Sequence, residues 1–438
     1  MTDAWTSETM SPQLLKVAER ARRDPKAQFH SIAHLIDVEA LERAYHRQRK
    51  DAAAGVDGVT KEQYGRDLEE NLRDLHERLR TKRYRHQPIQ RVHIPKEGGG
   101  KRPIGISGFE DKLVQDALRE LLEAIYEQDF HDCSYGFRPG RGAHDAIRAL
   151  DRIAHRGEVN WILEADIKSY FDSVDRPMLK EMLRERVPDG SITRLVGKCL
   201  HVGVLDGVDL SMPEVGTVQG SVLSPLLGNI YLHYALDQWF EREVKPRLVG
   251  TAHLIRYADD FIMTFERRED AERVMTALEK RLARHQLALQ PDKTRLIPFG
   301  RPSGDWKGKG PGTFDFLGFT LYWRRSRKGY WGMACKTRRA RLNRAMNRVY
   351  AWCRRYRHLT VPEQHAALTR RIQGHFNYFG VNGNLESLAH LVCHAERAWY
   401  KWLRRRGQRK RLNWKRFSDL LRSFPLPGPR IVVQIWGS

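Results

Sequence analysis

Three aspartates lie where strand-like segments of the sequence end. Asp259 and Asp260 are adjacent and have apolar residues on both sides, as expected for the tip of a buried hairpin. Side chains on a strand alternate between faces, so neighbouring aspartates can share a ligand only at a turn. Asp166 ends a second apolar run, at residues 161–165. Buried carboxylates repel each other and lose hydration, and a bound divalent cation compensates both effects.

An aspartate on one strand that faces an aspartate pair on a hairpin can hold two Mg²⁺ ions, about 3.5–4 Å apart. Phosphoryl transfer at such a centre needs positioning and charge neutralisation rather than a protein nucleophile. The sequence has no evident Ser–His or Cys–His arrangement, which fits that chemistry. Taken alone, an Asp–Asp pair is more often an ordinary turn, because turns favour aspartate. Asp166 makes the pattern a candidate metal site.

The order of motifs along the chain resembles the palm of reverse transcriptases, and in detail the reverse transcriptase/maturases of group II introns. Seven segments match the family in order: 91–96 with 101–106, 134–141, 166–172, 219–225, 257–260, 292–294 and 316–319. Residues 54–63 resemble the family's N-terminal extension, which many other reverse transcriptases lack. One motif alone would be only suggestive, whereas the ordered set is specific.

The resemblance implies metal ligands and a nucleotide site. Asp166, Asp259 and Asp260 would bind two Mg²⁺ ions, with help from the backbone carbonyl of Ile167, and Mn²⁺ would be able to substitute. Lys293 is a candidate proton donor to the pyrophosphate leaving group. The incoming deoxynucleoside triphosphate would contact Lys96, Arg102, Ser169, Tyr170, Phe171, Gln219 and Gly220.

Several of these residues can also be interpreted physically. Lys96 and Arg102 flank a glycine-rich loop that could close over phosphates, and ordinary solvated charge is the alternative. Gly220 permits a close backbone approach to a base pair. Phe171 would obstruct a 2′-hydroxyl and so favour DNA synthesis, with plain core packing as the alternative. Lys293 follows Pro-Asp and could equally belong to a solvated turn.

The positive charge is concentrated at the end of the chain. Residues 321–438 carry 27 Lys and Arg against 4 Asp and Glu, whereas residues 1–320 carry 50 of each, so the last segment holds the whole net charge of +23. Such concentration indicates a nucleic-acid partner. The arginines alternate with aromatic residues that can stack on bases, although a merely solvated charge run is the alternative. The candidate nucleic-acid-binding residues are Arg338, Arg341, Arg344, Arg348, Arg404, Arg405, Arg406, Arg409, Lys410 and Arg411.

We therefore expect an α+β fold, the right-hand polymerase with fingers, a palm built on an antiparallel sheet, a helical thumb and a basic C-terminal helical region. The expected divisions are a mostly helical N-terminal extension (1–80), fingers and palm (81–320), a thumb/maturase domain (321–405) and a basic tail (406–438). Apolar spacing predicts helices over 110–128, 224–240 and 271–285, and from 338 onward. Strands are predicted over 90–95, 161–166 and 314–322, with a two-stranded hairpin over 253–265.

Composition limits the other sites that the chain could carry. We find no run of about 18 apolar residues, so no membrane span is expected. No signal peptide is evident, and the five cysteines include no C-x-x-C pair, so neither a zinc site nor a disulfide framework is expected. The cysteine and histidine pairs of the family's nuclease domain are lacking, and we expect no endonuclease. A bacterial cytoplasmic location, in association with the nucleoid, fits these features.

The expected function is RNA-directed DNA synthesis. The expected partners are an RNA template, a DNA or RNA primer, deoxynucleoside triphosphates and a group II intron RNA whose splicing and retrohoming the protein assists. One alternative is a group II-like enzyme recruited to defence or DNA repair. Another is an RNA-binding splicing cofactor with little polymerase activity, against which the intact aspartates argue. A third is an RNA-templated RNA polymerase, against which Phe171 argues.

Overall fold

The computed structural model describes residues 10–95, 100–206, 209–211, 216–217, 220–303, 311–326, 328–406 and 412–436. The chain forms two compact units. The first consists of Met1–Gly142, Ala165–Phe261 and Glu269–Arg295, and the second of Ala143–Glu164, Ile262–Arg268 and Leu296–Ser438. Helices and strands are mixed in both units, as expected for an α+β fold.

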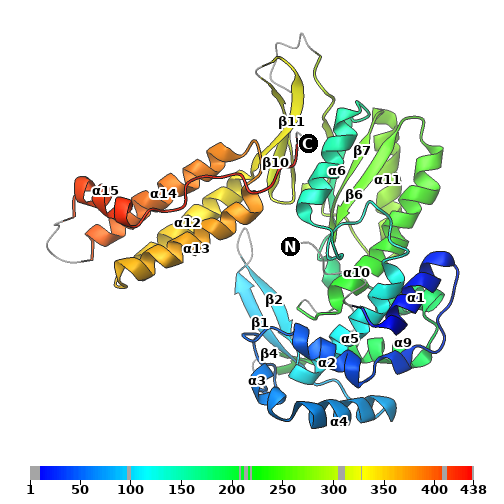
Figure 1. Ribbon diagram of the computed structural model, residues 1–438. Coiled ribbons are helices and arrows are strands. Elements are labelled where there is room, and N and C mark those ends of the chain that lie inside the picture. Colours follow the sequence, from blue (N-terminus) through cyan, green and yellow to red (C-terminus); the bar gives the residue numbers. More distant parts are fainter. Residues whose placement is uncertain are drawn as a thin grey trace. The chain divides into compact units, whose positions relative to one another are not determined.

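The first unit is organised around helix α5 (Phe109–Tyr126), which is buried over most of its length. Helices α1 (Pro12–Arg23) and α2 (Val38–Arg47) pack against it (Figure 1). The α5 helix was predicted from its apolar spacing, and the prediction is confirmed. The remaining helices of this unit are α3 (Lys61–Tyr64), α4 (Leu68–Arg80), α7 (Tyr170–Ser173), α8 (Arg176–Arg186), α9 (Gly190–Leu200), α10 (Ser224–Leu232) and, apart from its first residue, α11 (Arg268–Arg284).

One sheet of the first unit carries the glycine-rich loop between its first two strands. Its strand order is β2-β1-β4-β5, with β1 (Ile89–Pro95), β2 (Lys101–Ile106), β4 (Val204–Asp206) and β5 (Asp209–Ser211). Strands β1 and β2 are antiparallel, and Ile94 pairs with Arg102. The predicted strand over 90–95 is confirmed, whereas residues 96–99 of the glycine-rich loop lie outside the described residues.

A second sheet has the strand order β6-β7-β3-β8. Its strands are β3 (Trp161–Asp166), β6 (Ala252–Tyr257), β7 (Asp260–Phe265) and β8 (Arg295–Pro298). Only Ala258 and Asp259 separate β6 from β7, and a connection this short joins antiparallel neighbours. Most of both strands is buried. The hairpin predicted over 253–265 is therefore confirmed, and its turn contains the first aspartate of the pair.

The strand predicted over 314–322 is wrong. The segment forms two antiparallel strands, β9 (Phe314–Phe316) and β10 (Phe319–Arg325), in a sheet of order β11-β10-β9 with β11 (Trp331–Thr337). Leu317 and Gly318 both have positive φ, 51° and 81°, and reverse the chain between the strands. A two-residue turn with positive φ at both positions matches the twist of a hairpin. The domain division predicted at 320/321 falls inside β10.

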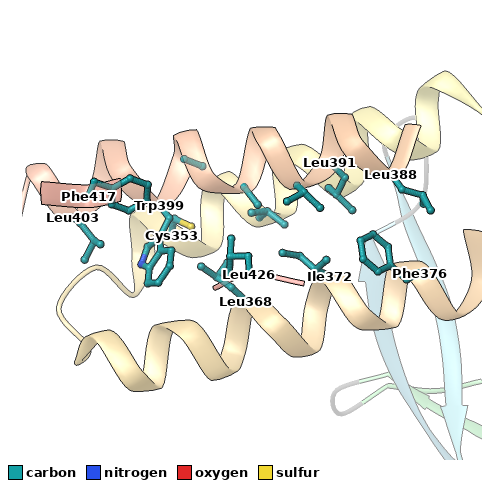
Figure 2. Close-up of a cluster of buried hydrophobic side chains, with 14 residues drawn as sticks. Cys353, Leu368, Ile372, Phe376, Leu388, Leu391, Trp399, Leu403, Phe417 and Leu426 are labelled. Atoms are coloured by element: carbon teal, nitrogen blue, oxygen red, sulfur yellow. The ribbon is translucent and has the colours of Figure 1, made fainter. Parts of the chain in front are cut away.

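The second unit ends in a group of helices: α12 (Arg339–Arg355), α13 (Val361–Phe379), α14 (Leu385–Arg404) and α15 (Trp414–Ser423). Figure 2 shows Leu368, Ile372 and Phe376 on α13 pointing toward Leu388 and Leu391 on α14. Buried residues of α12, α14 and α15 complete this cluster, including Cys353, Trp399 and Phe417. The helical pattern predicted from 338 onward is confirmed up to Ser423, whereas residues 424–436 form no helix.

Polar contacts fix this helical core at two points. The indole Nε1 of Trp399 donates to Oε1 of Gln364 at 2.9 Å, and both side chains are buried. Such a bond contributes about 1 kcal/mol, and its loss leaves a costly buried donor. The α13 helix starts with a capping box in which Thr360 and Glu363 satisfy each other's backbone N–H groups. Among the described residues, no helix is both long enough and apolar enough to cross a membrane.

Candidate active site

The structure brings Asp166 level with the Asp259–Asp260 pair. Strands β3 and β7 are neighbours in the sheet, and the backbone N–H of Asn160, just before β3, donates to the carbonyl of Phe265 at the end of β7. The two strands therefore run in opposite directions. Asp166 lies as many residues after Asn160 as Asp259 lies before Phe265. Asp166 and Asp259 are therefore at the same level in the two strands. Neighbouring strands lie about 4.8 Å apart, so the three carboxylates start from closely spaced backbones.

The turn that carries Asp259 has an unusual backbone conformation. Ala258 has a φ of 57°, in the left-handed region that alanine rarely adopts. Such a conformation persists only where its surroundings enforce it, and it is commonest at functional sites. Asp260 follows as the first residue of β7. The local geometry thus places Asp259 on the turn and Asp260 directly after it, so the predicted turn contains only the first aspartate of the pair.

Lys293 lies against the first aspartate. Its Nζ is 2.5 Å from Oδ2 of Asp166. The backbone explains this approach, because Asp166 O accepts from Gln290 N and Lys168 N donates to Ala288 O, both at 2.8 Å. These two bonds do not use the carbonyl of Ile167. A short 3₁₀ turn, Pro291–Lys293, then directs Lys293 back toward Asp166.

The donor set suits a hard divalent cation. Carboxylate and carbonyl oxygens are the ligands of Mg²⁺ and Mn²⁺, and the Asp166 carboxylate, about a quarter exposed, is already balanced by a cation, Lys293. Within the described residues, no three Asp, Glu, His or Cys side chains yet converge on a common point. Binding of an ion by all three aspartates would therefore require at least one of these side chains to reorient. The residues fit a metal site in kind and in position along the strands.

The segment after Asp166 combines exposed and buried residues. Ser169 is exposed and left-handed, with a φ of 47°. Tyr170 is buried, and its hydroxyl donates to the carbonyl of Gly228 on α10 at 2.6 Å. Burial raises the pKa of Tyr170 well above its usual range, and the charges of Arg256 and Asp259 act on it in opposite directions. Asp259 therefore lies within electrostatic reach of Tyr170. Contact of Tyr170 with a nucleotide would have to use its backbone, since its side chain is held in the core.

Phe171 is half-buried and packs beside Tyr170, with both rings close to Gly228 on α10. The two rings are 5.2 Å apart, and a Cβ built on Gly228 would come within 3.3 Å of the Phe171 ring. The carbonyl of Phe171 accepts from Thr217 N at 2.6 Å. Phe171 is thereby tied to the segment that leads to Gly220. The family resemblance implies that Phe171 lies beside the sugar of the nucleotide, and this remains a prediction.

Gly220 lies against the strand that carries Arg102. It has a φ of 107°, and a Cβ built on it would lie 2.5 Å from the carbonyl oxygen of Gly105 on β2. Any side chain here would collide with that strand, which explains the glycine. The backbone of Arg102 lies in β2. Lys96 and Gln219, the neighbouring candidates, lie outside the described residues.

The candidate nucleic-acid residues of the second unit are mostly exposed. On α12 the apolar positions Val349 and Cys353 are buried in the helical core, as predicted, and the arginines occupy the remaining surface. Arg338 forms an ion pair with Asp315 at 3.0 Å. Arg341, Arg348, Arg404, Arg405 and Arg406 are exposed, and Arg344 is half-exposed. Arg409, Lys410 and Arg411 lie outside the described residues.

Two residues near the candidate site, Gln115 and Phe137, were not among the predicted site residues. Gln115 on α5 is buried, and its side-chain oxygen accepts from Ser221 Oγ at 3.0 Å, which holds the segment after Gly220. Phe137 is left-handed and 53% exposed, with its ring 6.3 Å from that of Tyr257. An exposed aromatic residue in that conformation offers a stacking surface. Only the motif around Phe137 signalled it in the sequence.

Residues 94–321 match the family described as reverse transcriptase (RNA-dependent DNA polymerase). The match covers more than half of the chain and includes every described residue of the carboxylate centre. The chain belongs to the reverse transcriptase family.

The curated relatives of this chain differ in how much of their own length the chain covers. The chain is 33% identical to Protein YkfC of Escherichia coli over 354 residues, which is 72% of this chain and 88% of the relative. It is 32% identical to the group II intron-encoded protein LtrA of Lactococcus lactis over 275 residues, 60% of this chain but only 45% of the relative. An uncharacterized 91 kDa protein in a cob intron of Schizosaccharomyces pombe is 42% identical over 163 residues, 37% of this chain and 20% of that protein. The chain thus spans most of one relative and less than half of the other two.

Proposed function

We propose that this chain is a group II intron-type reverse transcriptase that copies RNA into DNA by two-metal-ion nucleotidyl transfer. The observation that supports this most directly is the register of β3 against β7, which puts Asp166 level with Asp259 within the family-matched segment. The lack of a protein nucleophile in the sequence agrees with this chemistry.

In this mechanism Asp166, Asp259 and Asp260 would hold two Mg²⁺ ions, with the carbonyl of Ile167 as a further ligand and Mn²⁺ as a substitute. The ions would neutralise phosphate charge and lower the pKa of the primer hydroxyl. The protein's own part is positioning. Asp166 releases Lys293, whose ammonium is then placed to donate a proton to the departing pyrophosphate.

The nucleotide is selected by groups that surround this centre. Phe171 would lie against the sugar and exclude a 2′-hydroxyl, while Ser169 and the Tyr170 backbone line the same segment. Gln219 and Gly220 would contact the nascent base pair, where glycine allows close approach. Lys96, which lies outside the described residues, and Arg102, in β2, would hold the triphosphate.

The proposed domains are those of a right-hand polymerase. Residues 1–80 would form the N-terminal extension, 81–320 the fingers and palm, 321–405 the thumb/maturase domain and 406–438 the basic tail. The excess of Lys and Arg after residue 320 supports an RNA-binding role for the last two. The partners would be template RNA, a DNA or RNA primer, and a group II intron RNA that the protein helps to splice. This activity belongs in the bacterial cytoplasm, near the nucleoid.

Primer extension on an RNA template tests the polymerase assignment. Asp259→Asn should abolish DNA synthesis and leave RNA affinity within a few-fold of wild type, because it removes a metal ligand and no RNA contact. A matched control is Asp74→Asn on the exposed face of α4, where the carboxylate pairs with Arg78. Asp74→Asn should retain synthesis. Near-wild-type synthesis by Asp259→Asn would show that the ligand assignment is wrong.

The intron assignment has a separate test. DNA that flanks the gene should encode the conserved domains of a group II intron RNA, and the protein should bind that transcript more tightly than an unrelated RNA of equal length. Equal affinity for both transcripts would leave a polymerase without an intron partner, and would favour recruitment to another cellular role.

A further inference from the structure

Arg256, at the end of β6, is completely buried although arginine is rarely so. Its guanidinium makes five hydrogen bonds to four residues. Nε and Nη2 donate to the two carboxylate oxygens of Asp237 at 2.7 and 2.5 Å, Nη1 donates to Asn229 Oδ1 at 2.9 Å and to Ala258 O at 3.1 Å, and Nη2 donates to Ser134 Oγ at 2.8 Å. A guanidinium has five N–H donors, so these bonds use all of them.

The bonds connect the aspartate-bearing turn to α10, to the helical segment that continues α10, and to the motif at 134–141. Asn229 lies on α10, Ser134 belongs to the motif at 134–141, and Ala258 is the left-handed residue directly before Asp259. Asp237 ends a π-helical segment, His233–Asp237, that continues α10. A π-helical segment shifts side chains relative to an α-helix and is frequent near functional sites. Here its last residue, Asp237, reaches the buried guanidinium.

Backbone hydrogen bonds also join Arg256 to the residues on either side of Ser134. Arg256 N donates to Cys133 O, and Tyr135 N donates to Arg256 O, each at 2.8 Å. A Cβ built on Gly136 would lie 2.4 Å from Ala258 N, so this segment touches the turn itself. Asn229 Nδ2 also donates to Gly136 O at 2.7 Å. Ala258 is therefore held between Gly136 and Arg256.

The buried charge is balanced but dependent on its geometry. Asp237 is also completely buried, and an ion pair in this setting becomes strongly unfavourable when one partner is lost. Lysine would keep the charge but could not reproduce the planar fork that spans four residues. The contacts thus require arginine in particular, not a positive charge in general.

We propose that Arg256 is a positioning residue that fixes the Ala258–Asp259 turn and thereby sets the geometry in which Asp259 presents its carboxylate. Arg256 contacts neither substrate nor metal in this role. The proposal rests on the proposed function of Asp259 as a ligand. A purely structural arginine would stabilise the unit without affecting the turn, and this difference can be measured.

A second buried arginine supplies a matched control. Arg186 is 4% exposed and lies in the same compact unit. It also makes five bonds, to both oxygens of Asp129 and to the carbonyls of Ala21, Asp24 and Ala27. Arg256→Lys and Arg186→Lys therefore remove comparable numbers of buried bonds. Only Arg256→Lys alters the aspartate-bearing turn.

Three measurements on the full chain test the proposal: Mn²⁺ binding by electron paramagnetic resonance, amide hydrogen exchange of residues 256–261, and thermal unfolding. Arg256→Lys should weaken Mn²⁺ binding by about 10- to 100-fold, as is usual when a group that orients a ligand is lost. It should also speed exchange in 256–261. Arg186→Lys should lower the unfolding temperature and leave Mn²⁺ binding and that exchange unchanged. Ser134→Ala, which removes a single bond, should weaken Mn²⁺ binding by a few-fold if Arg256→Lys does not fold.

The outcomes separate this proposal from the function that underlies it. Equal effects of Arg256→Lys and Arg186→Lys on Mn²⁺ binding would reduce Arg256 to a stabilising residue and overturn the proposal. Unchanged binding in both Arg256→Lys and Ser134→Ala would do the same. If Asp259→Asn itself leaves Mn²⁺ binding unchanged, the ligand assignment fails first, and the positioning role fails with it. Weak binding in Asp259→Asn with normal binding in Arg256→Lys would refute only the positioning role.

Discussion

The ammonium of Lys293 and the carboxylate of Asp166 form an ion pair of 2.5 Å, between a 3₁₀ turn and the end of strand β3. The carboxylate is about a quarter exposed and the ammonium about two thirds exposed, so the pair can open at little energetic cost. In the proposed mechanism Asp166 would exchange Lys293 for a metal ion. Lys293 would then lie close to the reacting phosphates, as a proton donor must.

Replacing Lys293 should slow the chemical step more than it weakens binding. Lys293→Met removes the proton donor, and we expect a fall of about 100-fold in the single-turnover rate of nucleotide addition, the lower range for general acid catalysis. Rapid-quench measurement at saturating nucleotide separates this rate from affinity. Lys293→Arg, which keeps the charge but donates a proton poorly, should fall nearly as far. A rate close to wild type in Lys293→Met would mean that Lys293 only balances Asp166.

Phe171 should control the choice of sugar. Phe171→Ala removes the ring beside Tyr170, and we expect incorporation of ribonucleotides relative to deoxynucleotides to rise by about tenfold or more, since excluding one small group is worth on the order of 1–3 kcal/mol. Phe171→Tyr keeps the ring and should keep the wild-type ratio. Competition assays with both sugars present give the ratio directly. An unchanged ratio in Phe171→Ala would assign the residue to core packing against α10.

Much of the site was predictable because it depends on local patterns. The β6–β7 hairpin follows from apolar runs on both sides of two aspartates, and α5 follows from a helical apolar stripe. The end of β3 at Asp166 was likewise predicted. The antiparallel register that brings Asp166 level with Asp259 is a long-range property, and the sequence indicated it only through the family resemblance.

Other features depend on contacts that no local pattern reveals. The β9–β10 turn was missed because Phe316-Leu317-Gly318-Phe319 is apolar throughout and resembles one buried strand. Arg256 looks like an ordinary charged residue, since its partner Asp237 lies 19 residues earlier on a π-helical segment. Burial and the choice of partner decide the role of such a residue, and both arise only in the folded chain.

Acid should destabilise the second unit through His375. Burial lowers the pKa of His375 on α13 to about 4, and its Nε2 has no hydrogen-bond partner among the described residues. The unfolded chain then binds a proton more readily than the folded one, so stability is lost as pH falls from about 6.5 to about 4. His375→Phe should lose less stability over this range, because phenylalanine takes up no proton on unfolding. Its ring can still pack on Phe379.

Denaturant midpoints at pH 7 and pH 4.5 measure this difference. His390→Gln is the control, since His390 is exposed on α14 and its replacement should leave the pH dependence as it is. If His375→Phe and wild type lose equal stability on acidification, the proton taken up on unfolding belongs to another group.

The basic tail allows a test of how much of the RNA affinity comes from the residues after 320 and how much from residues 1–320. Arg405 lies over the ring of Trp402 at 5.4 Å, and Arg406 donates to the carbonyl of His358 at 2.9 Å. These contacts hold the end of α14 and leave both arginines exposed. Because residues 1–320 are neutral overall, we expect their RNA contacts to be local, with most of the long-range attraction supplied after residue 320.

Substituting Arg404, Arg405, Arg406, Arg409, Lys410 and Arg411 by Gln should therefore flatten the salt dependence of RNA affinity. Each neutralised phosphate contributes a slope of about −0.7 to −0.9 in log affinity against log salt, so six contacts account for about four to five units. The control replaces six exposed cations of the first unit, Lys16, Arg22, Arg23, Lys26, Arg73 and Arg83, and should change the slope much less. Filter binding between 50 and 200 mM salt gives the slopes, and single-turnover extension at saturating primer-template should remain near wild type in both variants. Equal slopes in the tail variant and wild type would show that the tail is only solvated, and would place the RNA-binding surface elsewhere on the chain.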